Sequence, residues 1–363
     1  MKHHTFLGAA ARAGRLIALG GGACALAVLA ACQSAPPLVA AEPPIAPVKA
    51  AATGPAPPPP GNGVLASNEQ LAVYVAKAED TFASIALRFL GDASRDWEIA
   101  ELNELGKPRP GAALMVPLKP VNPLGVHAGQ YQTIPILCYH RVGSGGGKMF
   151  VSAASFAQQM EWLAANGYRL IRLKDVTGFL EGRQALPAKS VVLTFDDGYE
   201  SFYRYAYPLL KKYAFPATVF LYTDFVGASD ALTWSQMQEM VASGLVSIQA
   251  HSKTHANLME RGIDETDARY RQRLDAEARL PREQIERRLQ QEVSYFAYPF
   301  GDANDAVLDA MSKYRYRIGV TVNPGGNAFH AQPLMLRRTM IYGSHDLNDF
   351  KARLQTSRAF ALP

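Results

Sequence analysis

The chain has 363 residues, and 48% of them are hydrophobic, so it is long enough for one large domain with a substantial core and a smaller unit. Its formal net charge of +5 falls to +2 if an N-terminal segment that carries Lys2, Arg12 and Arg15 is removed. A charge this small argues against nucleic acid as a partner.

The first 31 residues are typical of a signal peptide. A basic start precedes an apolar stretch over 16–30 that is too short for a comfortable membrane span. The stretch runs into Leu-Ala-Ala-Cys at Cys32, which resembles the cleavage box of bacterial lipoproteins. The resemblance implies a lipidated Cys32 and, with Gln33 following, a membrane anchor at the periplasmic face of the outer membrane. An ordinary signal peptide or a short anchor is the alternative.

Residues 32–70 are rich in Pro and Ala, which predicts an extended, semi-rigid linker that holds the folded part away from the lipid surface. Once Cys24 has left with the signal peptide and Cys32 carries lipid, Cys138 is the remaining cysteine. We therefore expect no intrachain disulfide, although the compartment is oxidising.

Residues 73–119 are predicted to form a small α+β domain with a βααβ pattern. Asp80 or Thr81 can cap a first helix whose apolar residues recur at helical spacing, and a second helix is expected over 97–103. This pattern resembles a LysM module. The resemblance implies binding of N-acetylglucosamine-containing glycans, such as peptidoglycan or chitin, with contacts near Asp80, Thr81 and Asn103. A domain that has lost glycan binding is the alternative.

From residue 130 to residue 357, strands alternate with helices, which predicts a parallel α/β domain. Aliphatic and β-branched runs over 134–142 and 217–221 predict two of its strands. Residues 259–292 are dense in Arg, Glu and Asp, and they predict a solvated helical insertion. In parallel α/β barrels the chemistry collects at the carboxyl ends of the strands.

A predicted buried strand over 191–195 ends in Asp196, Asp197 and Gly198. Two carboxylates at the end of a buried strand need a solvated site or a cation, because desolvating a charge is costly. Gly198 permits a tight turn that lets both carboxylates face one cavity. A plain surface turn is the alternative, since Asp-Gly is a common turn dipeptide.

Another predicted strand, over 245–250, runs into His-Ser-Lys-Thr-His at 251–255. If a helix begins here, His251 and His255 lie at i and i+4 on one face and can share one ion. With one carboxylate they form a three-ligand set that leaves a metal position open, as in catalytic zinc sites. A polar helix face is the alternative. The same ligands suit non-haem iron oxygenases, but the adjacent second Asp and the signal sequence argue against that class.

Three motifs together resemble those of the polysaccharide deacetylases (NodB-homology domain, carbohydrate esterase family 4). They are Thr-Phe-Asp-Asp-Gly at 194–198, His-Ser-x-x-His at 251–255 and Phe-Ala-Tyr-Pro-Phe-Gly at 296–301. The resemblance implies a distorted (β/α) barrel and a hydrolase that removes N-acetyl groups from a polysaccharide. It also implies that Asp197, His251 and His255 hold a divalent metal, most often Zn²⁺.

The resemblance further implies roles around the metal. Asp196 would be the general base, and the backbone N–H of Phe300 would bind the oxyanion in a site that Tyr298 and Pro299 also form. The third motif has Ala297 where an Arg that orients the base is usual, so the partner of Asp196 stays unassigned.

The usual late His motif is not evident either. The strand over 136–140 resembles that motif moved to the front, as in circularly permuted relatives, and so implies His140 as the general acid. A structural His at a strand end is the alternative.

Three hypotheses for function follow. The leading one is a metal-dependent N-deacetylase of peptidoglycan that its LysM-like domain holds on the substrate. The second is a deacetylase of exported poly-N-acetylglucosamine, a biofilm polysaccharide. The third is a glycan-binding lipoprotein with an inactive barrel, which we rank low because Asp196, Asp197, His251 and His255 are all present.

Overall fold

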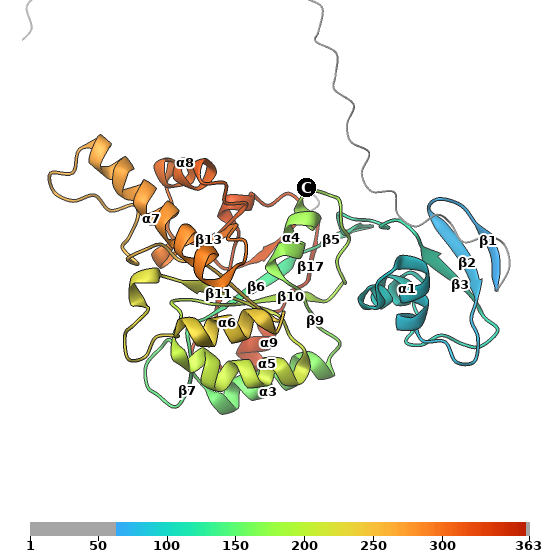
Figure 1. Cartoon of the computed structure of the whole chain (residues 1–363). Coiled ribbons are helices and arrows are strands. Elements are labelled where there is room, and N and C mark those ends of the chain that lie inside the picture. The colour runs from blue at the N-terminus through green and yellow to red at the C-terminus, as the bar shows by residue number, and fades with distance from the viewer. Residues whose placement is uncertain (1–62, 361–363) are drawn as a thin grey trace, which may run out of the picture. The chain divides into compact units, whose positions relative to one another are not determined.

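The computed structural model describes residues 63–360, which form a smaller and a larger domain (Figure 1). The predicted signal peptide, Cys32 and most of the predicted linker lie outside these residues, so the lipid anchor stays a prediction. Among the described residues, no helix has both the length and the apolar character needed to cross a membrane.

The smaller domain is an antiparallel sheet with two helices between its second and third strands. Its elements are β1 (Val64–Ser67), β2 (Leu71–Val75), α1 (Phe82–Leu90), η1 (Ala93–Arg95), α2 (Asp96–Leu102) and β3 (Ala113–Pro117). The predicted βααβ order is present from β2 to β3. However, β1 lies within the range 32–70 that we predicted to be linker, so that linker boundary is wrong. Four residues after a proline run are too few for a clear strand pattern.

The large domain has the predicted mixed α/β fold, built on parallel strands. In the described residues, six strands pair side by side in the order β14-β13-β12-β11-β10-β6, and each neighbouring pair is parallel. They are β6 (Ile134–Tyr139), β10 (Ser190–Phe195), β11 (Ala217–Leu221), β12 (Val246–Ala250), β13 (Tyr295–Ala297) and β14 (Ile318–Val320). These strands are almost wholly buried and apolar on both faces, as parallel strands covered by helices must be.

The sheet curls into a half-barrel, which agrees in part with the predicted distorted (β/α) barrel. A short segment after β14 touches both of its edges: Leu336 forms a bridge with Val320, and β16 (Thr339–Met340) pairs in parallel with β6. The same segment carries Arg338, whose side chain is completely buried. The remaining strands of this sheet are β9 (Arg169–Leu170), on β10, and β15 (Gly326–Asn327), antiparallel to β6.

Helices and short strands surround the sheet. The helical elements are α3 (Ala153–Ala165), α4 (Leu173–Leu180), η2 (Phe202–Ala206), α5 (Tyr207–Tyr213), η3 (Thr223–Phe225), α6 (Trp234–Ala242), α7 (Asp267–Leu289), η4 (Pro299–Gly301), α8 (Asp305–Lys313), η5 (Pro333–Met335) and α9 (Leu347–Ala352). The short strands are β4 (Val126–His127), β5 (Gln130–Gln132), β7 (Arg141–Gly143), β8 (Phe150–Ser152) and β17 (Ser357–Ala359).

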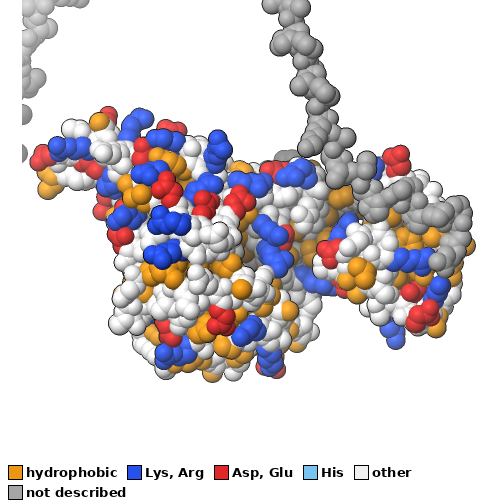
Figure 2. Space-filling model, viewed as in Figure 1, with side chains coloured by type: hydrophobic (Ala, Val, Ile, Leu, Met, Phe, Trp, Pro, Cys, Tyr) orange, Lys and Arg blue, Asp and Glu red, His pale blue; other side chains and the backbone are white. Residues whose placement is uncertain are grey.

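The charged segment over 259–292 forms a loop and then α7, as predicted. Ion pairs join residues one turn apart along the helix: Arg279 with Glu283, which are exposed, and Arg282 with Glu286, which are partly buried. Figure 2 shows acidic and basic side chains interspersed along it. The opposite face buries Tyr270, Leu274 and other apolar residues against the core, so α7 covers the sheet and is more than a solvated insertion.

Candidate active site

Asp196 and Asp197 lie at the end of β10, and both carboxylates are buried, with 3% and 6% of each residue exposed. The Asp196 N–H donates to Tyr139 O at 2.9 Å, which continues the pairing with β6. Asp197 and Gly198 then adopt left-handed φ values of 74° and 85°. A Cβ at Gly198 would lie 2.4 Å from Leu221 Cδ1. The turn is therefore the tight one predicted, and its buried carboxylates rule out the surface-turn alternative.

The segment after β12 is not helical, so the conditional prediction of a helix over 251–255 is wrong. Ser252 and His255 have φ values of 66° and 62°, and the His255 N–H donates to Ser252 Oγ at 2.9 Å. Such a local bond from a Ser side chain competes with helical backbone pairing. The loop still brings the two imidazoles together, with ring centroids 4.8 Å apart.

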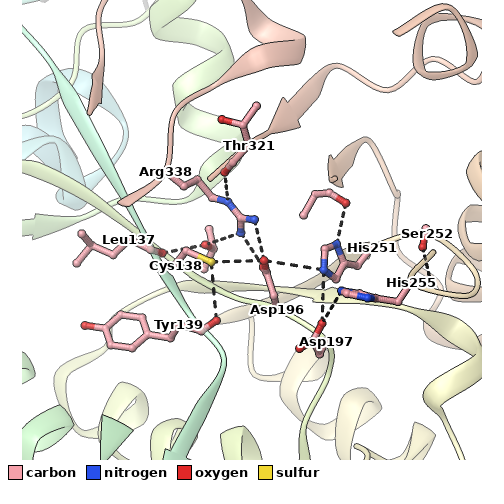
Figure 3. A network of polar contacts seen from close by, with 12 residues as sticks. Leu137, Cys138, Tyr139, Asp196, Asp197, His251, Ser252, His255, Thr321 and Arg338 are labelled. Atoms are coloured by element: carbon pink, nitrogen blue, oxygen red, sulfur yellow. Dashed lines mark hydrogen bonds and ion pairs between the residues drawn. The ribbon is translucent and has the colours of Figure 1, made fainter. Parts of the chain in front are cut away.

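Asp197, His251 and His255 converge on one point (Figure 3). His251 Nε2 lies 3.5 Å from Asp197 Oδ1, and His255 Nε2 lies 3.3 Å from the same oxygen. One ligand atom from each of the three residues lies within 4.8 Å of the other two. The loop therefore brings both histidines to Asp197, as the predicted helix would have done.

The three side chains fit a divalent metal. Asp197 Oδ1 is buried without a hydrogen-bond partner, a costly state that a cation would relieve. His251 Nδ1 lies 2.7 Å from Ala297 O, so this nitrogen carries the proton and Nε2 offers its lone pair toward Asp197. Burial alone would raise the pKa of Asp197, but both imidazoles lower it, so the carboxylate stays anionic. Two imidazoles and a carboxylate are a familiar ligand set for catalytic Zn²⁺.

Asp196 has a cationic partner that we did not predict from the sequence. Arg338 Nη1 and Nη2 donate to Asp196 Oδ1 and Oδ2 at 2.6 and 2.7 Å. Burial alone would raise the pKa of Asp196, but the guanidinium lowers it below the ordinary value. Arg338 Nε also donates to Thr321 O at 2.9 Å, which fixes the plane of the group. Arg338 therefore occupies the role left open by Ala297. The available signal was the pair of arginines at 337 and 338 inside the largely apolar run over 334–341.

Cys138 also contacts Asp196, the predicted general base. Its Sγ lies 3.4 Å from Asp196 Oδ2, and burial raises the pKa of the thiol well above its usual value. The thiol is therefore neutral and inert, and it packs beside the base as an apolar group with a weak S–H donor.

His140 directly follows β6, whose last residue, Tyr139, pairs with the residue before Asp196. The imidazole is partly buried, and its Nδ1 has no hydrogen-bond partner. Burial lowers the pKa of His140, against the opposite effect of Asp196 and Asp197. The structure thus places a titratable group without a fixed partner next to the two carboxylates, where the predicted general acid is needed.

The third motif contributes one exposed residue and two buried ones. Phe300 has a φ of 61°, is 59% exposed, and its ring centroid lies 5.1 Å from that of His255. Tyr298 is completely buried, and its hydroxyl donates to Leu334 O at 2.8 Å. Pro299 is buried at the start of η4. The prediction that Tyr298 contacts substrate therefore needs correction: its side chain is buried and supports the wall of the half-barrel.

In the smaller domain, the three residues predicted to bind glycan all have structural partners. Asp80 Oδ2 accepts from Tyr74 Oη and from Lys77 N, each at 2.7 Å. Thr81 caps α1 by accepting from Ser84 N at 3.0 Å. Asn103 bonds the backbone at both Ile99 and Met115. These contacts account for the side chains without a ligand, so glycan binding by Asp80, Thr81 and Asn103 stays a prediction.

Comparisons with known proteins agree with this geometry. Residues 183–319 match the family model of polysaccharide deacetylase. The protein YxkH of Bacillus subtilis, whose name describes a polysaccharide deacetylase, is 34% identical over 192 residues, which are 53% of this chain and 65% of that relative. The poly-beta-1,6-N-acetyl-D-glucosamine N-deacetylase of Escherichia coli K12 is 26% identical over 243 residues, 57% of this chain and 36% of that protein. The chain thus spans less than two thirds of each.

Among solved structures, the Streptococcus pyogenes deacetylase PplD in complex with acetate superposes with a TM-score of 0.56 at 28% identity. The match covers 61% of this chain and 98% of that structure. The matching family model, the related sequences and the shared fold agree with the curled sheet and the Asp-His-His cluster. We conclude that residues 183–319 match the polysaccharide deacetylase family and that the larger domain shares the fold of these deacetylases.

Proposed function

We propose that this protein is a metal-dependent hydrolase that removes N-acetyl groups from N-acetylglucosamine residues of a cell-envelope polysaccharide. The observation that carries the proposal is the convergence of Asp197, His251 and His255 next to Asp196, a carboxylate held by a buried cation. Names of relatives that specify polysaccharide deacetylases support the same reaction.

We assign roles to the residues from the family resemblance, and their positions support the assignment. A bound Zn²⁺ would lower the pKa of a water molecule and polarise the acetamide carbonyl. Asp196, kept ionised by Arg338, accepts the proton of the attacking water. The backbone N–H of Phe300 donates to the oxyanion that forms at the acetamide oxygen when water attacks the carbonyl carbon. His140 then donates a proton to the departing nitrogen, and the C–N bond breaks. Acetate is released, and a free amine remains on the polymer.

Two polymers are candidates for the substrate. Peptidoglycan is supported by the βααβ order of the smaller domain, which resembles a LysM module and would hold the enzyme on the wall. Poly-N-acetylglucosamine is supported by the relatives in Escherichia coli and Staphylococcus aureus whose names specify that polymer. In the second case the smaller domain would serve as an anchor.

We also propose that the protein is attached to the envelope by lipid at Cys32, at the periplasmic face of the outer membrane. The support is the Leu-Ala-Ala-Cys run after an apolar stretch. Mass spectrometry of the N-terminal peptide from the membrane fraction tests this proposal. A Cys32 without lipid, or a chain that keeps the residues before Cys32, would refute it.

Acetate release by the chain from Gln33 onward tests the reaction. Peptidoglycan sacculi and β-1,6-linked poly-N-acetylglucosamine should be compared with Zn²⁺ and with a chelator. Zn²⁺-dependent release from one polymer identifies the substrate class. No release from either polymer by a protein with metal in its site would contradict the proposed function and favour the binding role.

A further inference from the structure

One carboxylate on α7 departs from the solvated pattern of that helix. Glu277 is only 4% exposed, and both of its oxygens bind the loop that joins the two metal-ligand histidines. Glu277 Oε2 accepts from Lys253 N at 2.8 Å and from Thr254 N at 3.0 Å, and Oε1 accepts from Thr254 Oγ1 at 2.8 Å. A buried carboxylate is tolerated only when donors satisfy it, and here three donors come from two adjacent residues.

The loop needs such support because its backbone is strained. Ser252 and His255 both have left-handed φ values, which non-glycine residues adopt only where their surroundings hold them. Lys253 and Thr254, the two residues between them, are the ones that Glu277 binds. The side chain of Lys253 also pairs with Asp224 at 2.6 Å, but that contact is largely exposed and therefore weaker.

The position of His255 depends on this backbone. Its Nε2 lies 3.3 Å from Asp197 Oδ1, while the imidazole is partly exposed and, unlike His251, has no backbone carbonyl on its second ring nitrogen. Packing against the rings of Tyr222 and Phe300, at centroid distances of 5.2 and 5.1 Å, is its other support. Of the two histidines, His255 is thus the one whose place is set mainly by its loop.

We propose that Glu277 is a positioning residue of the metal site: it fixes Lys253 and Thr254 so that His255 meets Asp197 and His251. The inference rests on the proposed metal centre. It assigns α7 a part in that centre through a single buried side chain, while the exposed Glu283 on the same helix pairs only with Arg279.

Zn²⁺ affinity tests the proposal without recourse to activity. We would measure Kd by competition with a chromophoric chelator for the wild-type chain, for Glu277→Met, which keeps the length but removes the acceptors, and for Glu283→Met as the matched control. We expect Glu277→Met to bind Zn²⁺ about 10–100-fold more weakly, as is usual when groups that orient metal ligands are removed. Glu283→Met should bind as the wild type does. Saturating Zn²⁺ should restore much of kcat in Glu277→Met, which a global structural defect would not allow.

The possible results test the metal centre and the role of Glu277 separately. A wild-type chain that binds no Zn²⁺ would refute the metal centre itself. A wild-type chain that binds Zn²⁺ together with a Glu277→Met variant of equal affinity would overturn only the role of Glu277. If Glu277→Met does not fold, Thr254→Val takes its place, because it removes one of the three bonds. A loss of about 2–10-fold in affinity is then expected, and an unchanged Kd overturns the proposal.

Discussion

Arg338 and Asp196 form a two-point ion pair in which neither side chain is appreciably accessible to solvent, with 0% and 3% exposed. The pair joins residues 142 positions apart, one at the end of β10 and one in the segment that touches both edges of the sheet. Two parallel N–H···O bonds hold the carboxylate in one plane. The pair therefore sets both the charge and the orientation of the proposed base.

Replacing Arg338 by Met should raise the pKa of Asp196, because burial then acts without the opposing cation. The base would be protonated at a higher pH than in the wild type, so the acid limb of the kcat/KM profile should move upward in pH. Loss of one partner of a buried pair should also cost about 3–5 kcal/mol of unfolding free energy. Arg337→Met is the control, since Arg337 is exposed. An acid limb that does not move would contradict the assignment of Asp196 as the base.

Asp197→Asn should bind Zn²⁺ poorly and release little acetate, because the amide keeps the shape but loses the charge that the metal needs. Elemental analysis of the purified protein and an acetate assay measure the two effects. The exposed Asp302 supplies the control as Asp302→Asn. Treatment of the wild type with a chelator should abolish activity, and Zn²⁺ should restore it. An Asp197→Asn protein with full metal content would show that the ligand assignment is wrong.

His140→Gln should lower kcat by about 10²–10⁴-fold if His140 protonates the leaving nitrogen. Burial lowers the pKa of His140, so loss of its proton should appear as a descending limb at or below about pH 6.5 in kcat/KM. The variant should lack that limb. If His140 is only structural, the limb persists in the variant while the thermal unfolding midpoint falls, and the pH profile separates the two roles.

Gly198→Ala should destabilise the protein, because the position combines a φ of 85° with a Cβ site 2.4 Å from Leu221 Cδ1. Gly244→Ala is a matched control, since its φ is 73° and no atom lies within 4 Å of the added Cβ. We expect roughly 1 kcal/mol of lost stability at Gly244, from backbone strain alone. At Gly198 the overpacking adds about 1–3 kcal/mol. Chemical denaturation measures the loss of unfolding free energy in both variants. Equal losses would mean that Leu221 moves aside without an energetic cost.

Sequence patterns predicted the elements whose signal is local. The run over 217–221 is β11, and the run over 134–142 contains β6. The cluster of Asp197, His251 and His255 was also predictable, because short motifs carry these three residues. The loop conformation of 251–255 was not, since the spacing i, i+4 suits a helix equally well and the bonds from Ser252 and Glu277 decide between them.

The partners of these groups could not be predicted from the sequence, for a physical reason. Arg338 reaches Asp196 only because the sheet curls until the segment after β14 meets β6, and no local pattern encodes that distance. Glu277 lies in a run of charged residues, and nothing in the sequence distinguishes this buried carboxylate from its exposed neighbours. In both cases the tertiary structure, and not the local sequence, determines which charged side chain is buried at the site.

The place of Arg338 near the end of the domain has a consequence for biosynthesis. His140 emerges from the ribosome early, whereas the cation that holds the base emerges after nearly all of the barrel has been made. A nascent or truncated chain that stops before residue 338 would contain both aspartates and both histidines but could not neutralise Asp196. Contacts between such distant parts of a chain form slowly, because their loops must close first. We therefore expect the proposed deacetylase activity to be absent until the segment that carries Arg338 has docked, so that activity itself reports the folding of the larger domain.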